Sequence, residues 1–150
     1  MIVETICGIA NVGPDANGYI YLGIADKPSD SDRIRELDGV TPVFIAAVPE
    51  VAIVGVDREL AASAMTFDKY MRVIVDAISS SELTDPLKTN VLGCIDVVNY
   101  KGRSIVRVTV PRQTQVSFVG DDCYLRKNAS THKASGPQIA AVTARFSKGV

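Results

Sequence analysis

The chain has no tryptophan, a single histidine and three cysteines, and these scarcities exclude several kinds of site. A structural zinc centre needs four ligands, usually Cys and His at close spacings. Cys7, Cys94 and Cys123 lie far apart along the chain, so with one histidine they do not supply such a set. Their odd number also argues against a disulfide framework. We therefore expect reduced, mostly buried thiols in a cytoplasmic protein.

Long apolar runs are lacking too. The longest stretch with few charges, Gly39 to Val56, is interrupted by Pro42, Pro49 and Glu50, and it is too polar to be a bilayer span of about 20 apolar residues. The first residues have no basic region followed by a long apolar region, so we expect no signal peptide and no membrane partner. A length of 150 residues with 47% hydrophobic residues is typical of one globular domain.

The net charge of −1 indicates no strong preference for a partner, but the charges are distributed unevenly. Residues 1–100 contain 7 Lys and Arg against 15 Asp and Glu, whereas residues 101–150 contain 9 against 2. Such asymmetry is typical of a surface that meets an anionic partner. Pairing of the two halves with each other is the alternative.

Hydrophobic periodicity predicts a chain of short strands and about three helices. The expected elements are a helix over residues 1–10, strands over 19–25, 43–47 and 51–56, a helix after Thr66 that ends at Ser79-Ser80-Ser81, a hairpin of 91–99 with 104–110, a smaller hairpin over 116–126 that turns at Gly120, and a last helix introduced by Pro137. This order lacks a regular alternation of strand and helix. It predicts an α+β fold, a two-layer sandwich with one mixed β-sheet.

Two blocks of sequence carry a family resemblance. The first is Ile6-Cys7-Gly8-Ile9-Ala10-Asn11 followed by the strand from Gly18 to Asp26, and the second is Tyr124 to Thr131, preceded by a strand from Arg103 to Pro111. In this order they resemble the Schlafen AlbA_2 domain, in which an apolar block, glycines and a strand ending on Asp are followed later by a Tyr-x-Arg block and a helix. The similarity covers most of the chain, so residues 1–150 are expected to be one such domain.

The resemblance implies a nucleic-acid-binding domain of bacterial transcriptional regulators and defence proteins, which also occurs in the Schlafen nucleases. Asp26 matches the carboxylate at the end of the first core strand. The C-terminal block is matched by Tyr124, Arg126, Ser130 and Thr131. Asn128 replaces a glycine of that block, and Asn is one of the few residues that tolerate a positive φ. A loop from Gly13 to Gly18 replaces the paired glycines of the family.

One further departure concerns catalysis. The nuclease members have an upstream strand with two glutamates that hold a divalent metal together with the strand-end aspartate, and this chain starts after that strand. Glu4 matches neither glutamate. We therefore expect a fragment of a longer protein without a complete catalytic site. Asp26 is the candidate metal-binding and catalytic residue, with Asp15 and Asp30 as further oxygen ligands for Mg²⁺. A Schlafen-type metal-dependent RNase with an incomplete site is one alternative, and a protein-interaction or dimerisation module is another.

The candidate nucleic-acid contacts are cations and short polar side chains in the C-terminal third, a combination that suits phosphate. They are Lys101, Arg103, Tyr124, Arg126, Lys127, Asn128, Ser130, Thr131 and Lys133. Neither DNA nor RNA is favoured. Tyr19 and Tyr21 share a strand face and are able to stack on bases, but we expect them in the core. The Gly13 to Gly18 loop does not end in Gly-Lys-Ser/Thr, so nucleotide hydrolysis is not expected.

The first helix begins at the start of the chain, which leaves the apolar side of its first turn without an upstream neighbour. Ile2, Val3 and Ile6 form that side. Small apolar patches often mark contacts, so we expect a homodimer that covers them.

Overall fold

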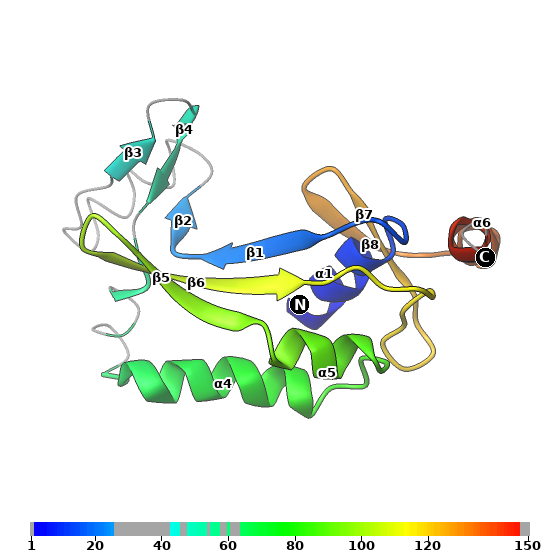
Figure 1. Ribbon diagram of the computed structural model, residues 1–150, viewed down its shortest axis with the longest axis horizontal. Coiled ribbons are helices and arrows are strands. Elements are labelled where there is room, and N and C mark those ends of the chain that lie inside the picture. The colour runs from blue at the N-terminus through cyan, green and yellow to red at the C-terminus, as the bar shows by residue number, and fades with distance from the viewer. Residues whose placement is uncertain are drawn as a thin grey trace. The chain divides into compact units, whose positions relative to one another are not determined.

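The computed structural model describes residues 2–25, 43–45, 48–53, 55–57, 60 and 64–147. Its elements are α1 (Ile2–Ala10), β1 (Gly18–Leu22), β2 (Ile24–Ala25), β3 (Val43–Ile45), β4 (Val48–Ile53), α4 (Phe67–Ser79), α5 (Leu87–Leu92), β5 (Ile95–Tyr100), β6 (Arg103–Val110), β7 (Tyr124–Lys127), β8 (Ser130–Lys133) and α6 (Gly136–Ser147). Figure 1 shows helices and strands mixed along the chain, and the predicted α+β class is confirmed.

The described strands form three sheets, where a single mixed sheet was expected. Their orders are β1-β6-β5, β2-β4-β3 and β7-β8. Gly23 explains part of the difference, because its φ of +103° interrupts the predicted strand over residues 19–25. A Cβ at this position would lie 3.0 Å from the backbone of Gly55, so the interruption depends on glycine. Beyond it, β2 pairs with β4.

The chain divides into two compact units. The first comprises Met1–Ile20, Arg72–Ile95 and Val108–Val150, and the second comprises Tyr21–Met71 and Asp96–Arg107. The core of the first unit includes side chains from α1, α4, α5, β6 and α6, among them Ile6, Ile78, Val91, Val108 and Val142. Each such side chain contributes about 1.5 to 3 kcal/mol through its burial.

The starts of α4 and α6 are capped by nearby side chains. Thr66 Oγ1 accepts a hydrogen bond from the N–H of Lys69 at 3.2 Å, which confirms the predicted cap of α4. At the start of α6, Ser135 Oγ accepts from the N–H of Gln138 at 3.4 Å, and Gln138 Oε1 accepts from the N–H of Ser135 at 2.9 Å. This reciprocal pair is a capping box, and it places Pro137 in the first turn, where the missing N–H costs nothing.

The predicted hairpin of residues 91–99 with 104–110 exists, but its first strand begins at Ile95. Lys101 and Gly102 form the turn with φ of +47° and +77°, as tight hairpins require. Val91 and Leu92, expected at the start of the first strand, belong to α5, because Leu87 and Val91 are four residues apart and both are buried on one helix face. The described helices are therefore α1, α4, α5 and α6, one more than expected.

The smaller hairpin lies later in the sequence than expected. Around Gly120 the strand contacts are isolated bridges, from Val119 to Leu83 and to Asp122. The hairpin itself is β7–β8, which turns at Asn128-Ala129. The φ of Asn128 is +54°, in agreement with the expectation that Asn replaces a glycine there. Strand β8 is exposed at three of its four positions, so it lacks the apolar alternation that would have predicted it.

In the second unit, Pro49 does not separate two strands as expected. It lies inside β4, where the pairing with β3 changes register between Phe44 and Ile45. A bulge tolerates proline because the ladder bond that its missing N–H would donate is not needed there.

Candidate nucleic-acid interface

The two strands of the hairpin β7–β8 bring six of the nine candidate contacts together. Its antiparallel register pairs Tyr124 with Lys133, Leu125 with His132, Arg126 with Thr131 and Lys127 with Ser130. Because side chains alternate between the faces of a strand, Tyr124, Arg126, Thr131 and Lys133 lie on one face, and Leu125, Lys127, Ser130 and His132 lie on the other. Asn128 lies in the turn, so seven candidates belong to this hairpin.

The Arg126 side chain forms a hydrogen bond within its own hairpin. Its Nη1 donates to Thr131 Oγ1 at 2.9 Å, and Thr131 Oγ1 donates to Thr5 Oγ1 of α1 at 3.3 Å. This chain of bonds joins the first face of the hairpin to the helix. Arg126 therefore has a structural task in addition to any contact with phosphate.

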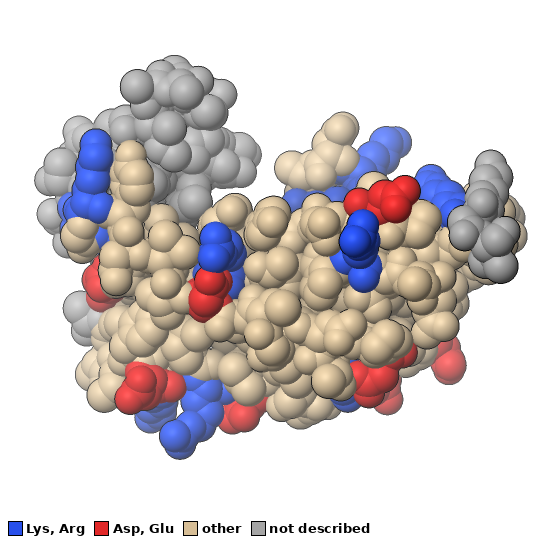
Figure 2. All heavy atoms as spheres, viewed as in Figure 1, with Lys and Arg blue, Asp and Glu red and all other residues tan. Residues whose placement is uncertain are grey.

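Lys133 is paired with a carboxylate. Its Nζ lies 3.0 Å from Asp122 Oδ1, and this hydrogen bond raises the pKa of Lys133. Both side chains are largely exposed, so the pair contributes little to stability. Burial raises the pKa of the nearby Tyr124, with Glu4 and Asp122 adding to the effect, so its hydroxyl stays protonated at neutral pH. Figure 2 shows Lys and Arg side chains around the hairpin with an acidic group beside them.

The exposed polar side chains at the hairpin tip are those of Lys127, Asn128 and Ser130. Among the residues that the structure describes, no carboxylate forms an ion pair with Lys127. Its ammonium group is therefore more available to an anion than that of Lys133.

Asn11 positions the hairpin, a role that the sequence did not reveal. The residue is 1% exposed, and its Nδ2 donates to the carbonyl oxygens of Ser117 and Tyr124 at 2.9 Å each. Its Oδ1 accepts from the N–H of Ser117 at 2.8 Å. One amide thus joins the C-terminal end of α1 to the start of β7. The only sequence signal is an Asn directly after an apolar helical turn.

Gly8 allows α1 to lie directly against β7. A Cβ at this position would be 3.2 Å from the carbonyl carbon of Leu125 and 3.3 Å from the nitrogen of Arg126. The helix and the strand are therefore in backbone contact, with no room for a larger side chain.

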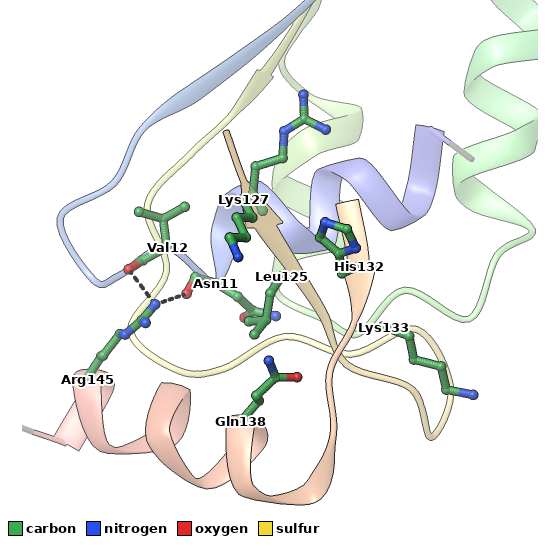
Figure 3. Close-up of a pocket in the computed structure, with 9 residues that line it drawn as sticks. Asn11, Val12, Leu125, Lys127, His132, Lys133, Gln138 and Arg145 are labelled. Carbon is green, nitrogen blue, oxygen red and sulfur yellow. Dashed lines mark hydrogen bonds between the residues drawn. The ribbon is translucent and has the colours of Figure 1, made fainter. Parts of the chain in front are cut away.

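A cleft of about 450 Å³ lies between the end of α1, the hairpin and α6. We call it the hairpin cleft, and its lining residues are Asn11, Val12, Leu125, Arg126, Lys127, His132, Lys133, Gln138 and Arg145. The lining contains four Lys or Arg residues and the only histidine, and it contains no Asp or Glu. Figure 3 shows Lys127, Leu125 and Gln138 around the opening, with Lys133 directed away from it.

Arg145 is a cleft residue that the sequence analysis missed. Its Nη1 donates to the carbonyl oxygens of Asn11 at 3.5 Å and Val12 at 3.3 Å (Figure 3). A cation at the C-terminal end of α1 satisfies carbonyls that the helix leaves unpaired. The bonds also hold α6 against the end of α1. Sequence could have indicated only that a basic residue lies in the last turn of the final helix.

Comparisons with models of protein families, with curated proteins and with solved structures found no match to this chain. The Schlafen AlbA_2 resemblance therefore stays a prediction. The functional argument rests on the geometry of the hairpin and its cleft.

Two candidate contacts, Lys101 and Arg103, belong to the second unit, on the hairpin β5–β6. Lys101 Nζ lies 5.5 Å from the centre of the Tyr100 ring, a cation–π contact. On the same hairpin Arg107 pairs with Asp96, and its hydrogen bond lowers the pKa of that carboxyl.

The expectation that Tyr19 and Tyr21 are core residues is wrong. They are 51% and 45% exposed, because they lie on the face of β1 opposite to Ile20 and Leu22. The alternative, an aromatic surface able to stack on bases, agrees better with this exposure.

The candidate metal ligands Asp26 and Asp30 lie outside the described residues. Within the described part of the chain, no three His, Cys, Asp or Glu residues gather as a metal site would require. Asp15 is exposed in the loop after α1.

The cysteines are free thiols. Cys7 and Cys123 are buried and Cys94 is partly exposed. Burial raises the pKa of Cys7 to about 12 and also raises the pKa of Cys123. The two buried thiols are therefore protonated and unreactive at neutral pH.

Proposed function

We propose that this chain is a nucleic-acid-binding module that contacts the phosphate backbone through the hairpin β7–β8. The observation that carries the proposal is the cationic, carboxylate-free lining of the hairpin cleft next to the exposed tip residues Lys127, Asn128 and Ser130. Cations, an amide and a hydroxyl on one short turn are the donors that phosphate oxygens accept.

The shape of the hairpin favours a polymer over a small free anion. A two-residue turn presents its donors at an exposed tip, and the cations continue from the tip into the cleft through Lys127 and Arg145. A strand of nucleic acid carries successive phosphates and is therefore able to contact the tip and the cleft together. The excess of basic residues after position 100 would also attract such a polymer from a distance.

Binding should therefore depend strongly on salt, and Lys127→Ala should weaken it. Removing one phosphate contact lowers the slope of log affinity against log salt concentration by about 1. Fluorescence anisotropy with labelled DNA and RNA strands measures both quantities. We choose Lys127 because Arg126→Ala would also break the bond to Thr131.

The matched control is Lys69→Ala, which removes an exposed lysine from α4 and should leave the binding unchanged. Absence of binding at low ionic strength would refute the proposal. An unchanged isotherm for Lys127→Ala would place the contact elsewhere on the chain.

The homodimer stays a prediction, and fewer accessible apolar residues support it than the sequence suggested. Ile6 is completely buried within the chain, so of the three residues expected at the contact only Ile2 and Val3 remain partly accessible. Light scattering measures the outcome. A mass of twice 16.0 kDa supports the dimer, and a mass of 16.0 kDa across the micromolar range contradicts it.

The wider biological setting rests on the resemblance and, for the cellular compartment, on the expected reduced thiols. A cytoplasmic location and a place in a longer regulatory or defence protein are proposals of that kind. The structure adds one fact, that within the described residues no helix has the length and apolarity to cross a membrane.

A further inference from the structure

The hairpin cleft has the size and form of a pocket for one small unit of a ligand. Its volume of about 450 Å³ lies in the range of ligand pockets, about 300 to 1,000 Å³. A phosphate group alone needs much less space. A double helix presents its bases stacked and paired, so it offers no unit that enters a pocket without being flipped out.

The lining offers contacts for both the base and the phosphate of a nucleotide. Leu125 contributes an apolar side chain, and Val12 is 50% exposed at the rim, so both offer apolar surface to the face of a base. Lys127 and Arg145 supply the cations for a phosphate. Figure 3 shows the Gln138 amide beside Leu125, where it is able to meet the polar edge of a base.

The walls of the cleft are held in place before any ligand arrives. Arg145 binds the carbonyl oxygens of Asn11 and Val12, the Gln138 side chain is fixed by the capping box, and the buried Asn11 amide holds the start of β7. A preformed pocket loses little conformational entropy on binding. Arg145 reaches the carbonyls through Nη1, which leaves its other N–H groups for a ligand.

We propose that the hairpin cleft binds one unpaired nucleotide of a single strand, with its base against Val12 and Leu125 and its phosphate near Lys127 and Arg145. This inference rests on the proposed function and narrows it to single-stranded nucleic acid. The strand backbone crosses the hairpin tip, and one base leaves the stack to enter the cleft.

The test compares three probes in the same anisotropy assay: an oligothymidylate strand, an abasic strand with the same number of phosphates, and a duplex. The thymidylate strand should bind at least about fivefold more tightly than the abasic strand, because contact of one base with the protein strengthens binding by about this factor or more. Equal affinities of these two strands would overturn the inference while the proposed function stands. If none of the probes binds at low salt, the proposed function fails as well.

A cleft-filling variant shows whether the base preference arises here. Val12→Met places a longer apolar side chain at a residue that lines the cleft without changing the charge, and it should reduce the preference for thymidylate to less than about twofold. Val73→Met on α4 is the matched control, because Val73 is 52% exposed and does not line the cleft. A preference that persists in Val12→Met would overturn the assignment to the cleft.

A measurement on the unchanged protein does not depend on the folding of a variant. His132 is the only histidine and lines the cleft, so its imidazole C–H resonances report on that place alone. Thymidine 5′-monophosphate should shift these resonances more than inorganic phosphate does. Equal shifts with both ligands, or no shift with either, would overturn the inference.

Discussion

Replacing Asn11 by Ala should lower the free energy of unfolding by about 3 to 5 kcal/mol. The substitution leaves two backbone groups without their partner, the N–H of Ser117 and the carbonyl of Tyr124. It also removes one of the two donors to the Ser117 carbonyl, and the other, the Cys7 thiol at 3.3 Å, is a weak one. Asn11 is 1% exposed, so water does not replace these bonds easily. Each unsatisfied buried group costs about 1 to 3 kcal/mol. A domain with a total stability of about 5 to 15 kcal/mol would lose a large part of it.

Urea denaturation followed by circular dichroism measures this loss. Asn17→Ala is the matched control, because Asn17 is exposed and its Oδ1 accepts one hydrogen bond, from the N–H of Arg112 at 3.1 Å. The control should cost about 1 kcal/mol or less. A loss below about 1 kcal/mol for Asn11→Ala would mean that the amide does not hold the hairpin to α1.

Gly8→Val should destabilise the chain by about 2 kcal/mol and weaken the binding of oligonucleotides. A Cβ already lies 3.2 Å from the carbonyl carbon of Leu125, and valine adds two methyl groups at this backbone contact. Overpacking of this kind costs about 1 to 3 kcal/mol. Relief of the strain requires β7 to move away from α1, which changes the shape of the hairpin cleft.

Gly8→Ala separates the packing effect from helix propensity. Alanine gains about 1 kcal/mol of helix propensity over glycine, and this gain opposes the strain of the 3.2 Å contact, so its net effect should be small. Gly136→Ala is the control at a position where a Cβ would meet nothing within 4 Å. Thermal melts of the three variants give the comparison. A Gly8→Val protein as stable as the wild type would contradict the close packing of α1 on β7.

The sequence predicted the elements that are stabilised by residues close to one another along the chain. Helix α4 has a capping Thr66 and apolar residues at helical spacing, and the turn at Lys101-Gly102 follows from a glycine between two β-branched runs. The positive φ of Asn128 agrees with the resemblance, which places Asn128 at a glycine of the C-terminal block, and Asn is one of the few residues that tolerate this conformation. The α+β class then followed from the order of the elements.

The candidate site was predicted only in part. The C-terminal block indicated Arg126, Lys127 and Asn128 by their chemistry, and all three lie in one hairpin. Their individual roles were not predictable, because Arg126 depends on Thr131 and Lys133 depends on Asp122, and neither bond follows from spacing. Aromatic residues in a strand are typical of a core, so Tyr19 and Tyr21 were expected to be buried. Only the packing of β1 shows that they lie on its exposed face.

Local sequence signals were enough to predict the fold class, helices α1, α4 and α6, the turn at Lys101-Gly102 and the basic character of the C-terminal third. These properties depend on side-chain periodicity, backbone preferences and charge, which each segment carries alone. Tertiary structure decided how the strands divide among three sheets and which face of β1 is exposed. It also decided that Asn11, Val12, Gln138 and Arg145 meet the hairpin to form a cleft. The contacts of Asn11 and Val12 with the hairpin and with α6 join residues more than a hundred positions apart, and they form only when α1 packs against β7, so no local pattern encodes them.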